Sequence, residues 1–123
     1  MDGNAIFNFT TIEVPQLINE AIAYSGYSKD AIDYFLFHQP NRFILERLGD
    51  LLGVIREKMP NDTSTIYGNT SSVSIPQTIC HALGDRMLDH DYLVCLSGFG
   101  VGLTWNAMVT RLGPLTVCKI IEF

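Results

Sequence analysis

The spacing of hydrophobic residues predicts three amphipathic helices, separated by short apolar runs that are typical of strands. The first helix has its apolar residues on one face, namely Val14, Leu17, Ile18, Ala21 and Ile22. We expect it to begin near residue 5 or 6 and to end at Gly26, because glycine suits the left-handed conformation of a helix C-cap. Pro15 lies inside this helix and should kink it or divide it in two.

An uninterrupted apolar run, from Tyr34 to Phe37, predicts a strand that is covered on both faces. A polar segment follows it at once and contains His38 and Asn41, with Asn41 placed as the N-cap of a second helix. Open α/β sheets carry their functional sites at the carboxyl ends of strands, so His38 is well placed for chemistry. The second helix ends at Gly53, and its apolar stripe comprises Ile44, Leu48, Leu51 and Leu52.

The middle of the chain predicts a polar loop over residues 56–64 and a short strand over residues 65–67. A loop over residues 68–72 then leads to a third helix. Pro76 suits the first turn of that helix, because proline lacks a backbone N–H and an N–H in the first turn has no acceptor within the helix. The buried stripe of this helix comprises Ile75, Ile79, Leu83 and Met87.

Two strands, over residues 93–96 and 103–112, flank a glycine loop at 98–102. Residues 115–121 are apolar and β-branched, which is typical of an edge strand or of a docked tail. The order of elements predicts an α/β layered fold that ends in a hairpin-like pair of strands.

Composition and charge narrow the classes of function. The 123 residues form one domain, and a hydrophobic fraction of 47% is enough for a packed core. The net charge of −5 argues against binding to nucleic acid or to an anionic membrane surface. No apolar run approaches the ~20 residues of a spanning helix, and no signal peptide is visible. Cys80, Cys95 and Cys118 show no C-x-x-C spacing, so we expect reduced thiols in a cytoplasmic protein and no metal site.

His38 and Asn69 are the candidate catalytic side chains, and each also has a structural interpretation. A histidine after a strand is often a satisfied structural residue, and Gly-Asn is a common turn pair. In the functional interpretation, His38 is either a neutral donor to a developing oxyanion or a general base. Asn69 would be a second neutral donor to the same oxygen. The glycines of 98–102 fit a tight turn or a close approach of backbone N–H groups to a substrate, whereas a phosphate loop requires a helix next.

Four motifs, in this order, resemble the C-terminal half of a β-ketoacyl-acyl-carrier-protein synthase III. They are Gly3-Asn4-Ala-Ile-Phe7, His38-Gln-Pro-Asn41, Tyr67-Gly-Asn69-Thr-Ser-Ser72 and Gly98-Phe-Gly-Val-Gly-Leu-Thr-Trp105. The resemblance implies an α/β fold, the C-terminal half of a thiolase-like fold, with a mixed sheet covered by helices. It assigns residues 1–112 to that domain, without the first strand of the half, and leaves residues 113–123 as a tail extension.

The resemblance also implies a reaction and its site. Such enzymes condense an acyl-CoA with malonyl-acyl carrier protein and release carbon dioxide, with no cofactor beyond the CoA and phosphopantetheine thioesters that are substrates. His38 and Asn69 match the catalytic pair that stabilises the enolate, and the backbone N–H of Val101 matches an oxyanion donor. Val101 and Pro40 replace a common glycine and a common alanine, which points to a subfamily with an unidentified acyl substrate. The positions that match the pantetheine tunnel are Gly3, Asn4, Phe7, Asn41 and Ile44.

The nucleophilic cysteine of the family lies in the N-terminal half, and no cysteine of this chain matches its motif. We therefore expect half of an active site, inactive in isolation, whose partners are acyl carrier protein, acyl-CoA and the missing N-terminal half, in a full-length homodimer. The alternative is a non-enzymatic domain that binds pantetheine thioesters or serves as an interaction module. An acyl hydrolase with a thiol of its own would need a cysteine beside His38.

Overall fold

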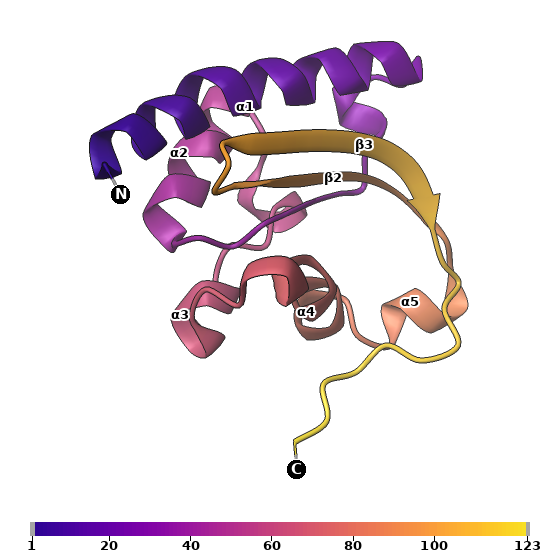
Figure 1. The fold of residues 1–123 in the computed structure, drawn as a ribbon. Helices are drawn as coiled ribbons and strands as arrows, with labels where there is room; N and C mark the ends of the chain where they lie inside the picture. Colours follow the sequence, from indigo (N-terminus) through magenta and orange to yellow (C-terminus); the bar gives the residue numbers. More distant parts are fainter. Residues whose placement is uncertain (1, 123) are drawn as a thin grey trace.

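A computed structural model describes residues 2–122 as one three-stranded sheet with helices on both faces (Figure 1). Three short 3₁₀ turns, at Lys29–Ala31, Arg56–Lys58 and Ser71–Val73, connect the longer elements. The helices and strands are α1 (Gly3–Ser25), β1 (Tyr34–Phe37), α2 (Arg42–Leu52), α3 (Thr63–Tyr67), α4 (Ser74–Ala82), α5 (Arg86–Asp89), β2 (Tyr92–Gly100) and β3 (Thr104–Leu112).

The sheet is mixed, with the strand order β1-β2-β3. β1 pairs parallel to β2, so that Phe37 lies opposite Ser97, and β2 pairs antiparallel to β3 from Tyr92↔Leu112 to Gly100↔Thr104. Figure 1 shows α1 along one face of the sheet and α4 beneath the other. The expected mixed sheet covered by helices is confirmed.

Alternate residues of β1 and β2 contribute to two separate apolar clusters. Phe35, Phe37 and Cys95 pack with α1 and α2, whereas Leu36 and Val94 pack with α4 and α5. Burial of a strand on both faces explains the absence of polar residues between Tyr34 and His38. The predicted two-faced strand is therefore confirmed.

The first helix is one continuous element, so of the two alternatives at Pro15, a kink or a division, the division is wrong. It begins at Gly3, earlier than expected, because the Asp2 side chain accepts hydrogen bonds from two N–H groups of the first turn. Pro15 is buried, so its ring packs in the core while the helix continues through it. Gly26 ends the helix with φ of 78°, as predicted.

Two further boundaries differ from the sequence prediction. Residues 65–67 are helical rather than extended, because the N–H groups of Thr65 and Ile66 bond the Asp62 carbonyl in the first turn of α3. The predicted third helix is interrupted at Gly84, which has φ of 50°, and is divided into α4 and α5. Leu83 and Met87 are nevertheless buried in one cluster, as their spacing predicted.

β2 runs through the predicted glycine loop as far as Gly100, so the turn itself is confined to residues 101–103. Beyond β3 the chain forms no strand over 115–121, and of the two alternatives it adopts the docked tail. The Leu115 N–H bonds the Met87 carbonyl, and Cys118, 3% exposed, lies with its Sγ 3.7 Å from that of Cys80. Between residues 2 and 122, none of the helices is long and apolar enough to cross a membrane.

Candidate functional site

His38 stands at the carboxyl end of β1, where the parallel pairing with β2 stops. The backbone N–H of His38 donates to the Ser97 carbonyl at 2.9 Å. This bond extends the pairing of β1 with β2 by one residue and fixes the backbone at His38. The next element begins at Arg42, with the Asn41 side chain accepting from the Ile44 N–H at 2.9 Å. The predicted N-cap is confirmed, and His38 lies between a strand end and a helix start.

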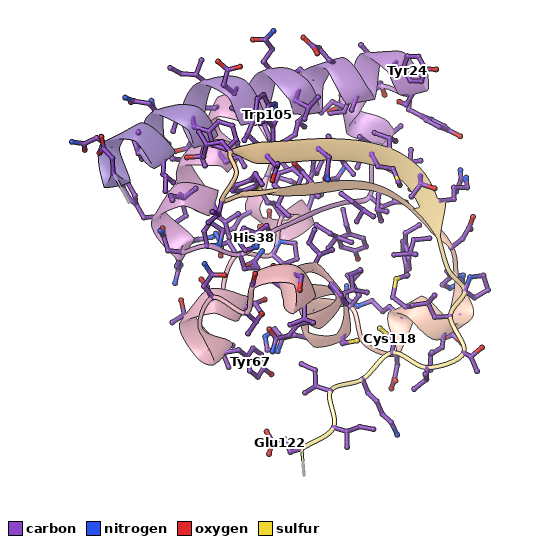
Figure 2. The ribbon with its side chains drawn as sticks, in the orientation of Figure 1. Tyr24, His38, Tyr67, Trp105, Cys118 and Glu122 are labelled. Carbon is purple, nitrogen blue, oxygen red and sulfur yellow. The ribbon has the colours of Figure 1, made fainter. Side chains whose placement is uncertain are left out.

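A cavity of about 590 Å³ opens beside His38. Its walls come from α1, the start of α2, the segment between α3 and α4, and the turn between β2 and β3. The cavity brings together His38, Asn69 and Val101, which are far apart in sequence. Figure 2 shows His38 between the strands and α4. The other lining residues are Ile6, Phe9, Thr10, Pro40, Ile44, Ser71, Ser72, Ser74, Ile75, Gly98, Phe99, Gly100, Leu103 and Thr104.

The imidazole of His38 is held on two sides. Its Nδ1 lies 2.6 Å from the Ser74 Oγ, and the Phe99 ring packs edge-on at 5.5 Å between ring centroids. Burial lowers the pKa of His38 below its usual value, and a backbone hydrogen bond with Ser71 acts in the opposite direction by a smaller amount. The ring is therefore neutral at pH 7.

Asn69 lies in the segment between α3 and the 3₁₀ turn that precedes α4. Its Oδ1 accepts a hydrogen bond from the Ser71 N–H at 3.0 Å. That bond occupies the oxygen and leaves the amide NH₂ as the group that can be offered to a ligand. The side chain is exposed, at the wall of the cavity.

The cavity lining carries no charged side chain among the residues that the structure describes, and His38 is its single titratable group. Ile6, Phe9 and Ile44 are among the residues of its apolar wall. A negative charge that forms here would depend on neutral N–H and O–H donors rather than on a lysine or arginine. Such donors are worth more in an apolar cavity than in water.

The predicted pantetheine positions fall into two groups. Ile44 lines the cavity, whereas Gly3, Asn4, Phe7 and Asn41 are not part of its lining. Gly3 and Asn4 form the exposed first turn of α1, and the Phe7 ring stacks on Phe43 at 5.8 Å. The Asn41 side chain caps α2. A contact of these four residues with pantetheine stays a prediction.

Sequence reasoning missed Ser74, whose hydroxyl meets His38. Pro76 indicated a helix that starts near residue 74, but a serine at a helix start is most simply a cap. The contact with His38 depends on how α4 packs against β1. That packing has no local signature in the sequence.

The three cysteines lie away from the cavity lining. Cys95 is buried within β2, and burial raises its pKa to about 12. Cys118, labelled in Figure 2, contacts Cys80 of α4. In the described part of the chain no cysteine faces His38, and no group of three or more His, Cys, Asp or Glu side chains is placed to hold a metal ion.

Comparison with known proteins gives consistent matches. The family described as 3-oxoacyl-[acyl-carrier-protein (ACP)] synthase III C terminal matches residues 22–112. Beta-ketoacyl-[acyl-carrier-protein] synthase III of Streptococcus equi subsp. equi is 40% identical over 114 residues, which cover 91% of this chain and 35% of that protein. The Streptococcus pyogenes serotype M5 protein of the same name is 43% identical over the same coverage.

A solved structure agrees with the whole of the described fold. The 3-oxoacyl-(acyl-carrier protein) synthase from Burkholderia xenovorans superposes with a TM-score of 0.93 and 41% identity, covering 100% of this chain and 35% of that one. The chain thus spans about a third of the length of these relatives. Its fold, its motifs and its matches place it in the family of 3-oxoacyl-[acyl-carrier-protein] synthase III C-terminal domains, which have the thiolase-like fold.

Proposed function

We propose that this chain supplies the His/Asn half of the active site of a β-ketoacyl-acyl-carrier-protein synthase III. The full-length enzyme would condense an acyl thioester with malonyl-acyl carrier protein. Its partners would be acyl-CoA, acyl carrier protein and the N-terminal half of the same polypeptide, in a homodimer. The observation that carries the proposal is the neutral cavity that His38, Asn69 and Val101 share.

Each residue has a distinct role in the proposed reaction. The malonyl thioester loses carbon dioxide, and the electrons of the broken C–C bond form an enolate whose negative charge lies on the thioester oxygen. His38 Nε2–H and the Asn69 amide donate hydrogen bonds to that oxygen. The enolate carbon then attacks the acyl carbon of a thioester on a cysteine of the N-terminal half, and when the resulting tetrahedral oxyanion collapses the C–S bond breaks and the cysteine leaves as a thiolate. The Val101 N–H donates to the oxyanion formed in this attack.

The protonation state of His38 supports its role as a hydrogen-bond donor rather than as an acid. Burial lowers its pKa, so the ring is neutral and offers one N–H. Among the described residues no carboxylate lines the cavity, so no negative charge there stabilises the imidazolium form. Release of carbon dioxide needs no external proton donor at this step, which suits a site built from neutral groups.

The proposal predicts different behaviour for the full-length polypeptide and for the 123-residue chain alone. With acyl-CoA and malonyl-acyl carrier protein, the full-length polypeptide should release carbon dioxide and form a β-ketoacyl product. The isolated chain should neither form an acyl-enzyme nor condense the two thioesters, because none of its cysteines lines the cavity. Labelled carbon dioxide and intact-mass spectrometry measure the two outcomes.

Two results would contradict this assignment. Rapid, stoichiometric thioester formation on Cys80, Cys95 or Cys118 of the folded chain would give the chain a nucleophile of its own. A full-length polypeptide that binds pantetheine thioesters but forms no product would favour the non-enzymatic binding domain instead.

A further inference from the structure

Ser74, on α4, contacts the segment that follows β1 and carries His38. It is the first residue of α4 and is 1% exposed. Its Oγ lies 2.6 Å from His38 Nδ1 and accepts a longer hydrogen bond, 3.4 Å, from the Gln39 N–H. A buried hydroxyl is therefore in contact with Nδ1 of His38, and Nε2 is the ring nitrogen left for the proposed reaction.

The partners of this hydroxyl decide the direction of the short bond. A serine hydroxyl carries one proton and accepts hydrogen bonds through its oxygen. The Gln39 N–H already donates to the oxygen, and Nδ1 is the acceptor that the described residues offer to the Ser74 proton. A ring nitrogen that accepts a hydrogen bond carries no proton, so the proton of the neutral imidazole lies on Nε2.

Further hydroxyl groups hold Ser74 in this place. The Thr78 hydroxyl donates to the Ser74 carbonyl at 2.7 Å and lies 3.1 Å from the Thr63 hydroxyl. Both threonines are fully buried, and they tie the first turn of α4 to α3. These contacts fix the backbone of Ser74, and its Oγ is buried against His38 Nδ1.

The chemical type of the partner determines what the imidazole can do. A carboxylate next to Nδ1 accepts Nδ1–H and leaves Nε2 as a general base, as in the serine protease triad. A hydroxyl that donates to Nδ1 has the opposite effect, since it leaves Nε2–H as a donor. It also adds no charge that would favour the imidazolium ion.

We propose that Ser74 is a positioning residue that selects the Nε2–H tautomer of His38 and directs this N–H into the cavity. The inference rests on the proposed function, in which that N–H donates to the malonyl thioester oxygen. It makes His38 a hydrogen-bond donor and excludes the role of general base, a choice that the sequence left open. Ser74 acts on the reaction through His38.

The test is the ¹⁵N NMR spectrum of the 123-residue chain with labelled histidine, recorded at pH 8 without substrate. Two-bond ¹H–¹⁵N correlations distinguish protonated from unprotonated ring nitrogens, and His38→Gln identifies the signals of His38 by their loss. We expect a protonated Nε2 and an unprotonated Nδ1. In Ser74→Ala the two nitrogen shifts should move toward each other, since both tautomers become populated, and Ser74→Thr should restore the separation.

Ser64→Ala is the matched control, because Ser64 lies on α3 outside the cavity lining, and its spectrum of His38 should be unchanged. A protonated Nδ1 in the unmodified chain would overturn the inference, and this result needs no variant to fold. Unchanged His38 shifts in folded Ser74→Ala would overturn it as well.

Kinetics of the full-length polypeptide separate this inference from the function on which it rests. Ser74→Ala should lower kcat for carbon dioxide release by about two- to tenfold, the equivalent of one net hydrogen bond, with little change in KM. An Nε2–H tautomer together with full activity of His38→Ala would refute the proposed function and leave the tautomer assignment intact. An Nδ1–H tautomer would refute the role of Ser74 whatever the activity.

Discussion

Alanine in place of His38 or of Asn69 should slow the release of carbon dioxide from malonyl-acyl carrier protein by about 10²–10³ in the full-length polypeptide. Each substitution removes one donor to the oxygen on which negative charge develops, a loss of about 3–4 kcal/mol in the transition state. Formation of the acyl-enzyme from acyl-CoA should change much less, since it takes place at the distant cysteine. The two assays are made on the same preparation of each variant.

His90→Ala and Asn19→Ala are matched controls, because both side chains are exposed and neither lines the cavity. They should retain the unmodified rates in both assays. An Asn69→Ala variant that loses acylation but keeps decarboxylation would show that Asn69 is not the enolate donor. Equal losses in both assays would indicate a general disturbance of the fold.

The second large effect concerns the strand that carries His38. Phe37 is 0% exposed and packs edge-on against Phe35 at 6.0 Å between ring centroids. Phe37→Ala should lower the free energy of unfolding of the 123-residue chain by about 3–5 kcal/mol, through lost burial and a residual cavity. Urea unfolding followed by circular dichroism measures the change, which is large against a typical stability of about 5–15 kcal/mol.

Phe43→Ala removes the same ring from an exposed position, since Phe43 is 66% exposed on α2. Its cost should stay below about 1 kcal/mol. If Phe37→Ala leaves no folded chain to measure, Phe37→Leu can be measured instead. It should lower the free energy of unfolding by less than Phe37→Ala but by more than Phe43→Ala. Similar costs for the Phe37 and Phe43 variants would place Phe37 outside the core.

Elements with a strong local pattern could be predicted from the sequence. The N-cap at Asn41 and the C-caps at Gly26 and Gly53 rest on contacts between near neighbours, and the apolar run before His38 is uninterrupted because both faces of the strand are buried. The convergence of His38 and Asn69 could be anticipated from ordered motifs. It could not be anticipated from either residue alone.

Other features depend on packing, and their local signals were misleading. Pro15 opposes a helix locally, but burial of α1 against β3 and α2 outweighs the loss of one backbone hydrogen bond. Residues 65–67 are rich in strand-forming side chains, yet no neighbouring strand is available to them, and they close a helical turn on Asp62. Ser74 gained its contact only through the docking of α4 on β1.

The buried thiol of Cys118 is a built-in probe of how firmly the end of the chain is attached. Burial, together with the hydrogen bond to Cys80, raises the pKa of Cys118 to about 11, which disfavours the reactive thiolate at pH 8. An alkylating reagent must therefore wait for the segment after Pro114 to leave α4. The rate of Cys118 alkylation, divided by the rate in the denatured chain, gives the fraction of time that the segment is detached.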